Sequence, residues 1–338
     1  MRRKRSTVTI QDVAAAAGVS VSTVSRVLND KDDVAEETYE NIQRVITQLG
    51  YTSSLAAKSM RSRKTNVIGL IMPDVDNSFS IEVLRGVNQA IIQFGYDLIT
   101  YTGGDSTASS WAAREQKYTS LLNGSITDGI IVVAPTASTF STAHPLVAID
   151  FHPGNIDFPT VIATNREGAL SAMEYLTQLG HRRIGFIGGR RDLQSAVRRH
   201  QGYLDGLQRA GIPIDSELFQ DGNFSMEVGY RCAQKLLRLA DRPTAIFAAN
   251  DESAFGVIKA AHEMGLRIPD DLSVVGFDNS PETVYFLPVG LTTVDQGLRQ
   301  MGLTATEVLV KLINGEKIDQ PISKVPTQLI VRGSCRAI

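Results

Sequence analysis

Hydroxyl side chains and one arginine lie close together near the N-terminus, in a pattern suited to contacting DNA. The stretch contains Ser20, Ser22, Thr23, Ser25 and Arg26. Hydroxyl groups bind phosphate oxygens and base edges, and a guanidinium can bond guanine through two hydrogen bonds. An ordinary small helical bundle is the alternative interpretation, but the hydroxyl run and the arginine favour DNA as the partner.

The sequence lacks the motifs of the common enzyme classes. No GxGxxG, P-loop, GxSxG or HExxH pattern is present, and the nearest approach, FIGGRRD, fails the glycine fingerprint of a dinucleotide site. The two cysteines, Cys232 and Cys335, have neither CxxC nor Cys/His spacing. We therefore expect a protein that is not an enzyme and that holds no metal and no cofactor.

Three short helices are predicted to position the hydroxyl run. Thr9 and Asp12 have the spacing that begins a helix, and Gly18 can end it. Ser20 can cap a second helix, and a third follows from about residue 36. Two short helices joined by a glycine-containing turn form a helix-turn-helix. The small residues AAAAG, at the end of the first helix, would let the two helices pack closely where they cross.

The charge of the chain is divided unevenly. Residues 1–64 hold 11 Lys or Arg and 7 Asp or Glu, a net of +4, whereas the remaining residues hold 23 and 29, a net of −6. A basic head on an acidic body indicates that the head meets a polyanion. The basic start MRRKRS has no apolar run after it, and no stretch is long enough to span a bilayer. We therefore expect a cytoplasmic protein with no membrane partner.

The rest of the chain has the pattern of an α/β protein. With 338 residues, of which 43% are hydrophobic, two or three globular domains are expected. Residues 51–66, YTSSLAAKSMRSRKTN, are polar and basic and have a linker composition. From residue 67 onward, apolar stretches such as VIGLIMP and RIGFIGG alternate with amphipathic helices. This alternation predicts doubly wound parallel sheets in two lobes, with a cleft where the strand C-termini meet.

Seven stretches occur in a fixed order along the chain: TIQDVAAAAGVSVSTVSRVLN, LGY, IGLIMPDVDNSF, LGHRRIGFIGG, RRHQGYLDGL, AIFAANDESAFGV and VVGFDNSP. In this order and spacing they resemble the LacI/GalR family of bacterial transcription repressors, over essentially the whole chain. The resemblance implies an N-terminal helix-turn-helix headpiece and a two-lobed core of doubly wound parallel sheets, similar to a periplasmic binding protein.

The resemblance also implies a division into domains. The headpiece would be residues 1–50, the hinge or linker helix 51–66, and the effector-binding and dimerisation core 67–338. Within the core, the expected lobes are 67–163 plus 294–324, and 164–293 plus 325–338.

By the same resemblance, the second helix would lie in the major groove. The residues expected to read base edges are Val21, Ser22 and Arg26. Val21 can offer only an apolar contact, for example to a thymine methyl, and simple burial is its alternative. The residues expected to position the headpiece on phosphates are Thr9, Ser20, Thr23, Ser25 and Asn29.

Paired hinge helices of a homodimer would open the minor groove of a pseudo-palindromic double-stranded operator. The hinge residues expected there are Ala57 and Met60, with Met60 at the wedge position. An inserted methionine can unstack a base step.

In the core, the resemblance implies a small-molecule effector between the lobes, held by residues at the strand mouths. The candidates are Asp74, Asn77, Ser78, Phe79, Asp150, Phe151, Arg199, Phe224, Asn250 and Asp278. Arg199 and Asp278 are the principal two, because charged groups at strand ends can bond vicinal hydroxyls. Core packing is the alternative for the three aromatic residues, and helix capping for Asn250 and Asp278.

These observations predict a sequence-specific DNA-binding regulator, a repressor, controlled by a small molecule for which a sugar is the first choice. A purine or nucleoside effector, or a protein co-regulator, is the alternative. A solute-binding protein of a transporter is the prediction from another class. It would carry a signal peptide and no helix-turn-helix, and this sequence shows the reverse.

Overall fold

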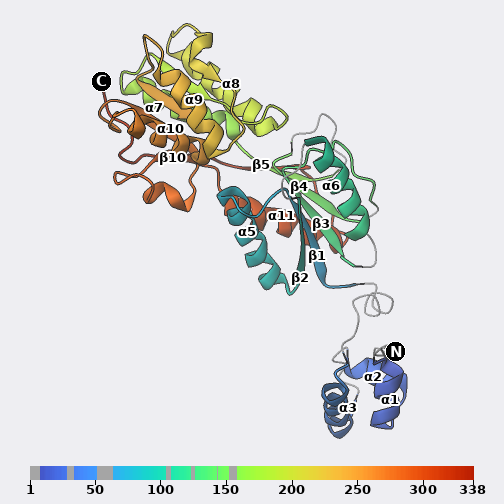
Figure 1. The fold of residues 1–338 in the computed structure, drawn as a ribbon. Coiled ribbons are helices and arrows are strands. Elements are labelled where there is room, and N and C mark those ends of the chain that lie inside the picture. Colours follow the sequence, from blue (N-terminus) through green and yellow to red (C-terminus); the bar gives the residue numbers. More distant parts are fainter. Residues whose placement is uncertain are drawn as a thin grey trace. The chain divides into compact units, whose positions relative to one another are not determined.

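The structure, a computed structural model, divides into a unit of residues Met1–Thr65 and a unit of residues Asn66–Ile338, drawn in Figure 1. We call them the headpiece unit and the core unit and describe each by itself. The structure describes residues 8–28, 34–51, 64–103, 108–122, 126–142, 144–151 and 158–338.

The headpiece unit contains α1 (Ile10–Ala17), α2 (Val21–Val27) and α3 (Glu36–Leu49). Their ends follow the predicted signals. Thr9 and Asp12 form a capping box at the start of α1, and the Ser20 side chain accepts a hydrogen bond at the start of α2. Gly18 and Gly50 end α1 and α3 with φ of 69° and 63°, in the left-handed region that glycine adopts without strain.

Aliphatic side chains, mostly valine, fill the centre of the headpiece unit. The buried residues are Val13, Ala14, Val24, Val27, Ile42 and Val45. Because valine and alanine occupy the contacts of α1 with α2, short helices can approach closely enough to exclude water. This packing leaves the hydroxyl-bearing side of α2 outside the core.

The first sheet of the core unit has six strands in the order β11-β5-β4-β3-β1-β2, and all of its neighbouring strands are parallel. Its strands are β1 (Val67–Met72), β2 (Asp97–Thr102), β3 (Gly129–Val133), β4 (Leu146–Ile149), β5 (Thr160–Ala163) and β11 (Ile322–Val325). The helices of this lobe are α5 (Ser78–Phe94), α6 (Ala108–Leu122) and α11 (Leu298–Ile313). The strands β1, β3, β4 and β5 are buried along their whole length, as their continuous apolar sequences predict.

The second sheet has six strands in the order β12-β10-β9-β8-β6-β7, and β12 is antiparallel to β10 while the others are parallel. Its strands are β6 (Ile184–Ile187), β7 (Phe219–Gln220), β8 (Ala245–Ala248), β9 (Ser273–Asp278), β10 (Thr292–Asp295) and β12 (Gln328–Ile330). Its helices are α7 (Asn165–Gln178), α8 (Gln194–Arg209), α9 (Met226–Leu237), α10 (Asp251–Glu263) and the short 3-10 turns η1 (Ser216–Leu218) and η2 (Pro281–Val284). Among the described residues, no helix is long and apolar enough to cross a membrane.

The chain passes between the two sheets after β5, after β10 and after β11 (Figure 1). Two of these connections are joined by side chains: the Oγ1 atoms of Thr164 and Thr327 lie 2.9 Å apart. The strand positions differ slightly from the predicted lobes. Residues 294–295 belong to the second sheet, because Asp295 pairs with Asp278, and Val325 belongs to the first, because it pairs with Ala163.

Helices α5 and α11 approach closely because each presents a glycine to the backbone of the other. A Cβ atom at Gly86 would lie 2.0 Å from the carbonyl oxygen of Arg299, and one at Gly302 would lie 2.2 Å from that of Val83. Neither position has room for a side chain. The two glycines therefore set the distance between these helices (Figure 1).

We expect Gly302→Ala to lower the free energy of unfolding by about 1–3 kcal/mol, because the added methyl group forces α5 and α11 apart. The loss is expected even though alanine favours an exposed helix by about 1 kcal/mol over glycine. Urea denaturation of both proteins measures the difference, and Thr304→Ala, at a half-exposed position on α11, is the control. Equal midpoints for Gly302→Ala and the wild-type protein would contradict the close crossing.

Candidate functional site

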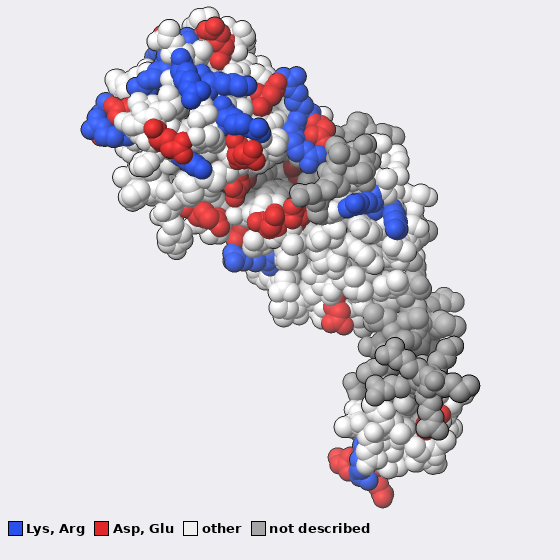
Figure 2. Space-filling view, viewed as in Figure 1, with Lys and Arg blue, Asp and Glu red and all other residues white. Residues whose placement is uncertain are grey.

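A cavity of about 510 Å³ lies where the strand ends of the two sheets of the core unit meet. Figure 2 shows a hollow in this unit with Asp and Glu side chains at its rim. Nine of the ten predicted effector residues line the cavity: Asp74, Asn77, Ser78, Phe79, Asp150, Arg199, Phe224, Asn250 and Asp278. The structure thus brings together residues that are far apart in the sequence and that come from both lobes.

Phe151 is the exception among the predicted effector residues. It is not among the described residues that line the cavity. Its ring stacks on Phe158 with the centroids 5.6 Å apart, and its carbonyl oxygen accepts a hydrogen bond from Thr160 at 3.0 Å. The structure therefore does not place Phe151 with the other nine residues, and its contact with the effector stays a prediction.

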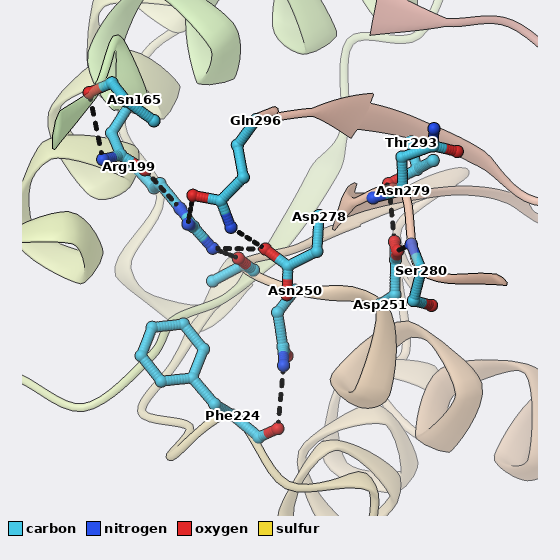
Figure 3. Close-up of polar contacts among 12 residues, drawn as sticks. Asn165, Arg199, Phe224, Asn250, Asp251, Asp278, Asn279, Ser280, Thr293 and Gln296 are labelled. Carbon is cyan, nitrogen blue, oxygen red and sulfur yellow. Dashed lines mark hydrogen bonds and ion pairs between the residues drawn. The ribbon is translucent and has the colours of Figure 1, made fainter. Parts of the chain in front are cut away.

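Arg199 is the centre of a buried polar network (Figure 3). The side chain comes from α8 and is 3% exposed. Its Nε donates to Asn165 Oδ1 at 2.8 Å, and its Nη2 donates to Gln296 Oε1 at 3.1 Å. Its Nη1 donates to the Ala249 carbonyl oxygen at 2.6 Å and to Asp278 Oδ1 at 3.2 Å. Because four acceptors hold the guanidinium, its plane is fixed before any ligand arrives.

Two aromatic rings lie next to this guanidinium. The Cζ atom of Arg199 lies 3.8 Å from the centroid of the Phe277 ring and 5.8 Å from that of Phe224. Aromatic faces attract cations, so both rings stabilise the buried charge. Phe224 also lines the cavity and offers an apolar face to a ligand.

Asp278 ends β9 with an unusual backbone and a shifted ionisation. Its Oδ1 accepts hydrogen bonds from Arg199 and, at 2.5 Å, from Gln296 Nε2. Burial raises the pKa of Asp278 from 3.8 to about 7; the Arg199 charge opposes this shift and the Asp150 charge adds to it. The capping alternative is therefore wrong for this residue, whose carboxyl group belongs to the arginine network.

Asp251 is a second buried carboxyl group on the same side of the cavity. It accepts hydrogen bonds from the Ser280 backbone N–H at 2.7 Å and from the Thr293 hydroxyl at 2.5 Å (Figure 3). Gly276 leaves the room it needs, since a Cβ there would lie 2.2 Å from Asp251 Oδ1. Burial, and secondly the charge of Asp278, raise the pKa of Asp251 well above its ordinary value.

Several cavity residues have backbone conformations that favour glycine. Positive φ values occur at Ala134 (45°), Asp150 (57°), Phe224 (73°) and Asp278 (114°), and all four residues line the cavity. Such conformations are sustained only where the surrounding structure imposes them, and they concentrate at functional sites. Their grouping here supports this cavity as the binding site.

Asn250 caps a helix, as the alternative interpretation of this residue predicts. Its Oδ1 accepts from the Ser253 backbone N–H at 3.0 Å at the start of α10, and its Nδ2 donates to the Phe224 carbonyl at 2.9 Å. Asn77 caps α5 in the same way, with Ser80 N at 2.9 Å. Both side chains also line the cavity, so the caps fix the loops that surround it.

The raised pKa of Asp278 determines how the free energy of unfolding changes with pH. The folded protein binds the proton of the Asp278 carboxyl group more tightly than the unfolded chain does. The protonated carboxyl group therefore contributes its full stabilisation below the ordinary pKa of 3.8, and this stabilisation is lost as the pH rises through about 7. We expect the wild-type protein to lose stability relative to Asp278→Asn between pH 5 and pH 8, by on the order of 2 kcal/mol.

Urea denaturation of both proteins at each pH measures this difference, in which the other titrating groups largely cancel. The asparagine oxygen can still accept from Arg199 and Gln296, so the variant keeps the network. A difference in unfolding free energy that stays constant from pH 5 to pH 8 would contradict the raised pKa.

In the headpiece unit, α2 exposes the residues predicted to read DNA bases. Val21 is 37% exposed, so burial, its alternative, is wrong. Ser22 and Arg26 are exposed as well. The Ser20 Oγ lies 2.6 Å from Ser22 Oγ and 2.8 Å from Thr23 Oγ1, so hydroxyl groups cluster at the start of α2.

The remaining predicted DNA residues divide between described and undescribed parts of the chain. Thr9 Oγ1 donates to Asp12 Oδ2 at 2.7 Å, and Ser25 is half-buried. Asn29, Ala57 and Met60 lie outside the described residues.

Sequence reasoning missed several residues that the structure places at the cavity or in its network: Ser80, Trp111, Asn165, Asp251, Ser280 and Gln296. Gln296 directly follows β10, whose sequence is TTVD. Predicting a strand for this stretch would have placed Gln296 at the end of a strand, among the candidate site residues. Trp111 lies in α6 and not at a strand end, so no such signal marks it.

Comparison with known proteins identifies the class. The domain described as bacterial regulatory proteins, lacI family, matches residues 9–54, and the periplasmic binding protein-like domain matches residues 173–335. A headpiece and core of this kind define a DNA-binding regulator with a ligand-binding core.

Relatives along the whole chain specify the family. The HTH-type transcriptional repressor PurR of Erwinia tasmaniensis is 36% identical, over 96% of this chain and 96% of its own, and that of Vibrio vulnificus is 32% identical, over 98% and 99%. The Lac repressor dimer bound to operator and the anti-inducer ONPF superposes with a TM-score of 0.86 at 25% identity, over 98% of this chain and 100% of its own. The complex of the transcriptional regulator CelR with cellobiose gives a TM-score of 0.73 at 28% identity, over 97% and 99%. The chain belongs to the LacI family of DNA-binding transcriptional regulators.

Proposed function

We propose that this regulator is a repressor that binds a pseudo-palindromic operator as a homodimer and is controlled by a sugar bound in the core cavity. One α2 helix would read each half-site, and operator symmetry would mirror the two-fold axis of the dimer. Such a protein acts on DNA inside the cell and catalyses no reaction. The headpiece is assigned to residues 1–50, the hinge to 51–66 and the two lobes to the core, with α2 carrying Val21, Ser22 and Arg26 to the bases.

The observation that carries the effector assignment is the buried network of Arg199 and Asp278 in the cavity. A guanidinium and a carboxyl group held side by side can bond two adjacent hydroxyls, which is the pattern that a sugar presents. The similarity to the CelR–cellobiose complex supports a carbohydrate. A purine or nucleoside is the second candidate, because Phe79 and Phe224 line the cavity and an aromatic ring can stack on a base.

Thermal denaturation of the full chain with a panel of sugars, sugar phosphates, purines and nucleosides tests the effector assignment. A ligand at a hundred times its dissociation constant adds about 2.7 kcal/mol of stability. A sugar that raises the melting temperature of the wild-type protein but not of Arg199→Lys would support the site, because lysine keeps the charge and loses the planar fork of donors. Stabilisation of both proteins by the same compound to the same extent would place the ligand elsewhere.

A further inference from the structure

Three buried polar atoms at the cavity have no hydrogen-bond partner among the described residues: Ser80 Oγ, Trp111 Nε1 and Ser280 Oγ. The three side chains belong to residues that are 0%, 3% and 3% exposed. All three residues line the same cavity. Ser253 Oγ is likewise buried without a partner, but Ser253 is not among the cavity-lining residues.

Buried polar groups in folded proteins are almost always hydrogen-bonded, because leaving one unpaired destabilises the fold. Three such groups around one cavity therefore indicate a ligand that completes their bonds. Neither the arginine network nor the helix caps uses these atoms. They are additional to the contacts assigned above.

The backbone holds these side chains in fixed positions. The Ser80 N–H is bonded to the Asn77 cap at 2.9 Å, and the Ser280 N–H is bonded to Asp251 at 2.7 Å. The six-membered ring of Trp111 lies against Gly103, where a Cβ would be 2.2 Å from Trp111 Cζ3. Nε1 belongs to the five-membered ring, on the other side of the indole from this contact.

The chemistry of these atoms specifies what the ligand presents. The indole N–H only donates, so the ligand atom that meets it must be an acceptor. Serine hydroxyls both donate and accept, so their partners can be hydroxyl groups. Ser80 and Trp111 belong to helices of the first lobe, whereas Ser280 follows β9 of the second lobe, so a ligand that bonds all three spans both lobes.

The ionisable groups around the cavity disfavour an anionic ligand. Among the described residues, its lining includes two guanidinium groups, those of Arg190 and Arg199, and the carboxyl groups of Asp74, Asp76, Asp150, Asp251, Glu252 and Asp278. Arg190 forms an ion pair with Asp192 at 2.6 Å, and Arg199 is held by its four acceptors. Each guanidinium is already bonded to a carboxyl oxygen, so a phosphate group would have to displace a carboxyl group in order to bond it.

We propose that Ser80, Trp111 and Ser280 bond the effector directly, and that this effector is an uncharged polyhydroxylated molecule and not a phosphate ester. The proposal rests on the proposed function, since it takes the cavity as the effector site. It adds the residues that select the ligand and excludes the phosphorylated form of any sugar that binds.

The sequence contains a single tryptophan, so fluorescence from Trp111 reports on this cavity alone. The full chain is titrated with D-ribose, D-glucose and cellobiose, with ribose 5-phosphate and glucose 6-phosphate, and with hypoxanthine and adenosine. Calorimetry on the same samples measures binding independently of fluorescence. At least one of the unphosphorylated sugars is expected to bind and to change the Trp111 emission, and its phosphate ester is expected to bind at least tenfold more weakly.

Three variants test the individual contacts. Trp111→Phe keeps an aromatic ring and removes the N–H, while Ser80→Ala and Ser280→Ala remove one hydroxyl each. Each is expected to weaken binding of that sugar by roughly fivefold to tenfold, as for the loss of one hydrogen bond. The melting temperatures of the two serine variants without ligand are not expected to fall, because the removed hydroxyl groups have no hydrogen-bond partner among the described residues. That of Trp111→Phe is expected to fall, because the smaller ring loses contacts in a packed apolar cluster. Ser253→Ala removes a buried hydroxyl away from the cavity and is expected to leave the affinity unchanged.

The outcomes separate this inference from the proposed function. Binding of a sugar that is unaffected by all three substitutions, tighter binding of a phosphate ester, or binding of hypoxanthine alone would overturn the inference and leave effector control standing. A lower melting temperature of the free serine variants would assign those hydroxyls a structural role and would also overturn it. A panel in which no compound binds would contradict the inference and the proposed function together.

Discussion

Replacing Arg199 by alanine is expected to abolish the response to the effector and to lower the free energy of unfolding by about 3–5 kcal/mol. The substitution leaves the Asp278 carboxyl group buried without its cation and leaves Asn165 Oδ1 and Gln296 Oε1 without their donor. A buried acceptor that loses its partner retains its full desolvation penalty. The same change therefore removes stability and the ligand contact.

Urea denaturation and calorimetric titration with the sugar that binds measure the two effects separately. Arg198→Ala is the matched control, because Arg198 directly precedes Arg199 in α8 and is exposed. Its side chain bonds Gln201 at 3.3 Å and takes no part in the hydrogen bonds described for Arg199. We expect this control to change neither quantity by more than about 0.5 kcal/mol. An Arg199→Ala protein as stable as the control, with full sugar affinity, would show that the network is not the binding centre.

Arg26→Ala is expected to remove base preference at one position of each half-site, with a loss of about 1–3 kcal/mol of discrimination. Arg26 lies on the exposed side of α2, whose N-terminal residues include Val21 and Ser22. A guanidinium that bonds a base edge carries sequence information, whereas one that bonds phosphate affects all sequences equally. The change is therefore expected at one base pair and not as a uniform weakening.

Selection of binding sites from random duplexes by the full-length wild-type and variant proteins measures the preference at every position. Arg44→Ala, at an exposed position of α3, supplies the control for a lost surface charge. A variant with the wild-type preference profile and uniformly weaker binding would assign Arg26 to the phosphate backbone.

The headpiece could be predicted from the sequence because its signals are local. The capping box of Thr9 and Asp12, the Ser20 cap and the Gly18 end depend on residues within one or two turns of each other. The same holds for the alternating strands and helices of the core. Arg199 and Asp278 could be predicted as site residues because charged groups at strand mouths converge in any doubly wound sheet.

The interactions that organise the cavity depend on contacts between distant segments and could not be predicted. Gln296 and Asn165 meet Arg199 only because β10, α7 and α8 pack together. Phe151 and Phe79 both follow a buried strand in the sequence, yet one ring stacks on Phe158 and the other, in the first turn of α5, lines the cavity. Trp111 is placed there by the fold of α6 against Gly103, which local periodicity does not encode.

The central claim is that the core cavity controls DNA binding by the headpiece, and one measurement tests it most directly. The affinity of the full-length protein for its selected operator is measured with and without saturating sugar, and the affinity for sugar is measured with and without operator, all at one salt concentration. Linkage requires the two ratios to be equal, and the coupling typical of allosteric proteins corresponds to roughly a 5- to 150-fold change. We expect equal ratios within this range. A sugar that binds the cavity and leaves operator affinity unchanged would contradict the account.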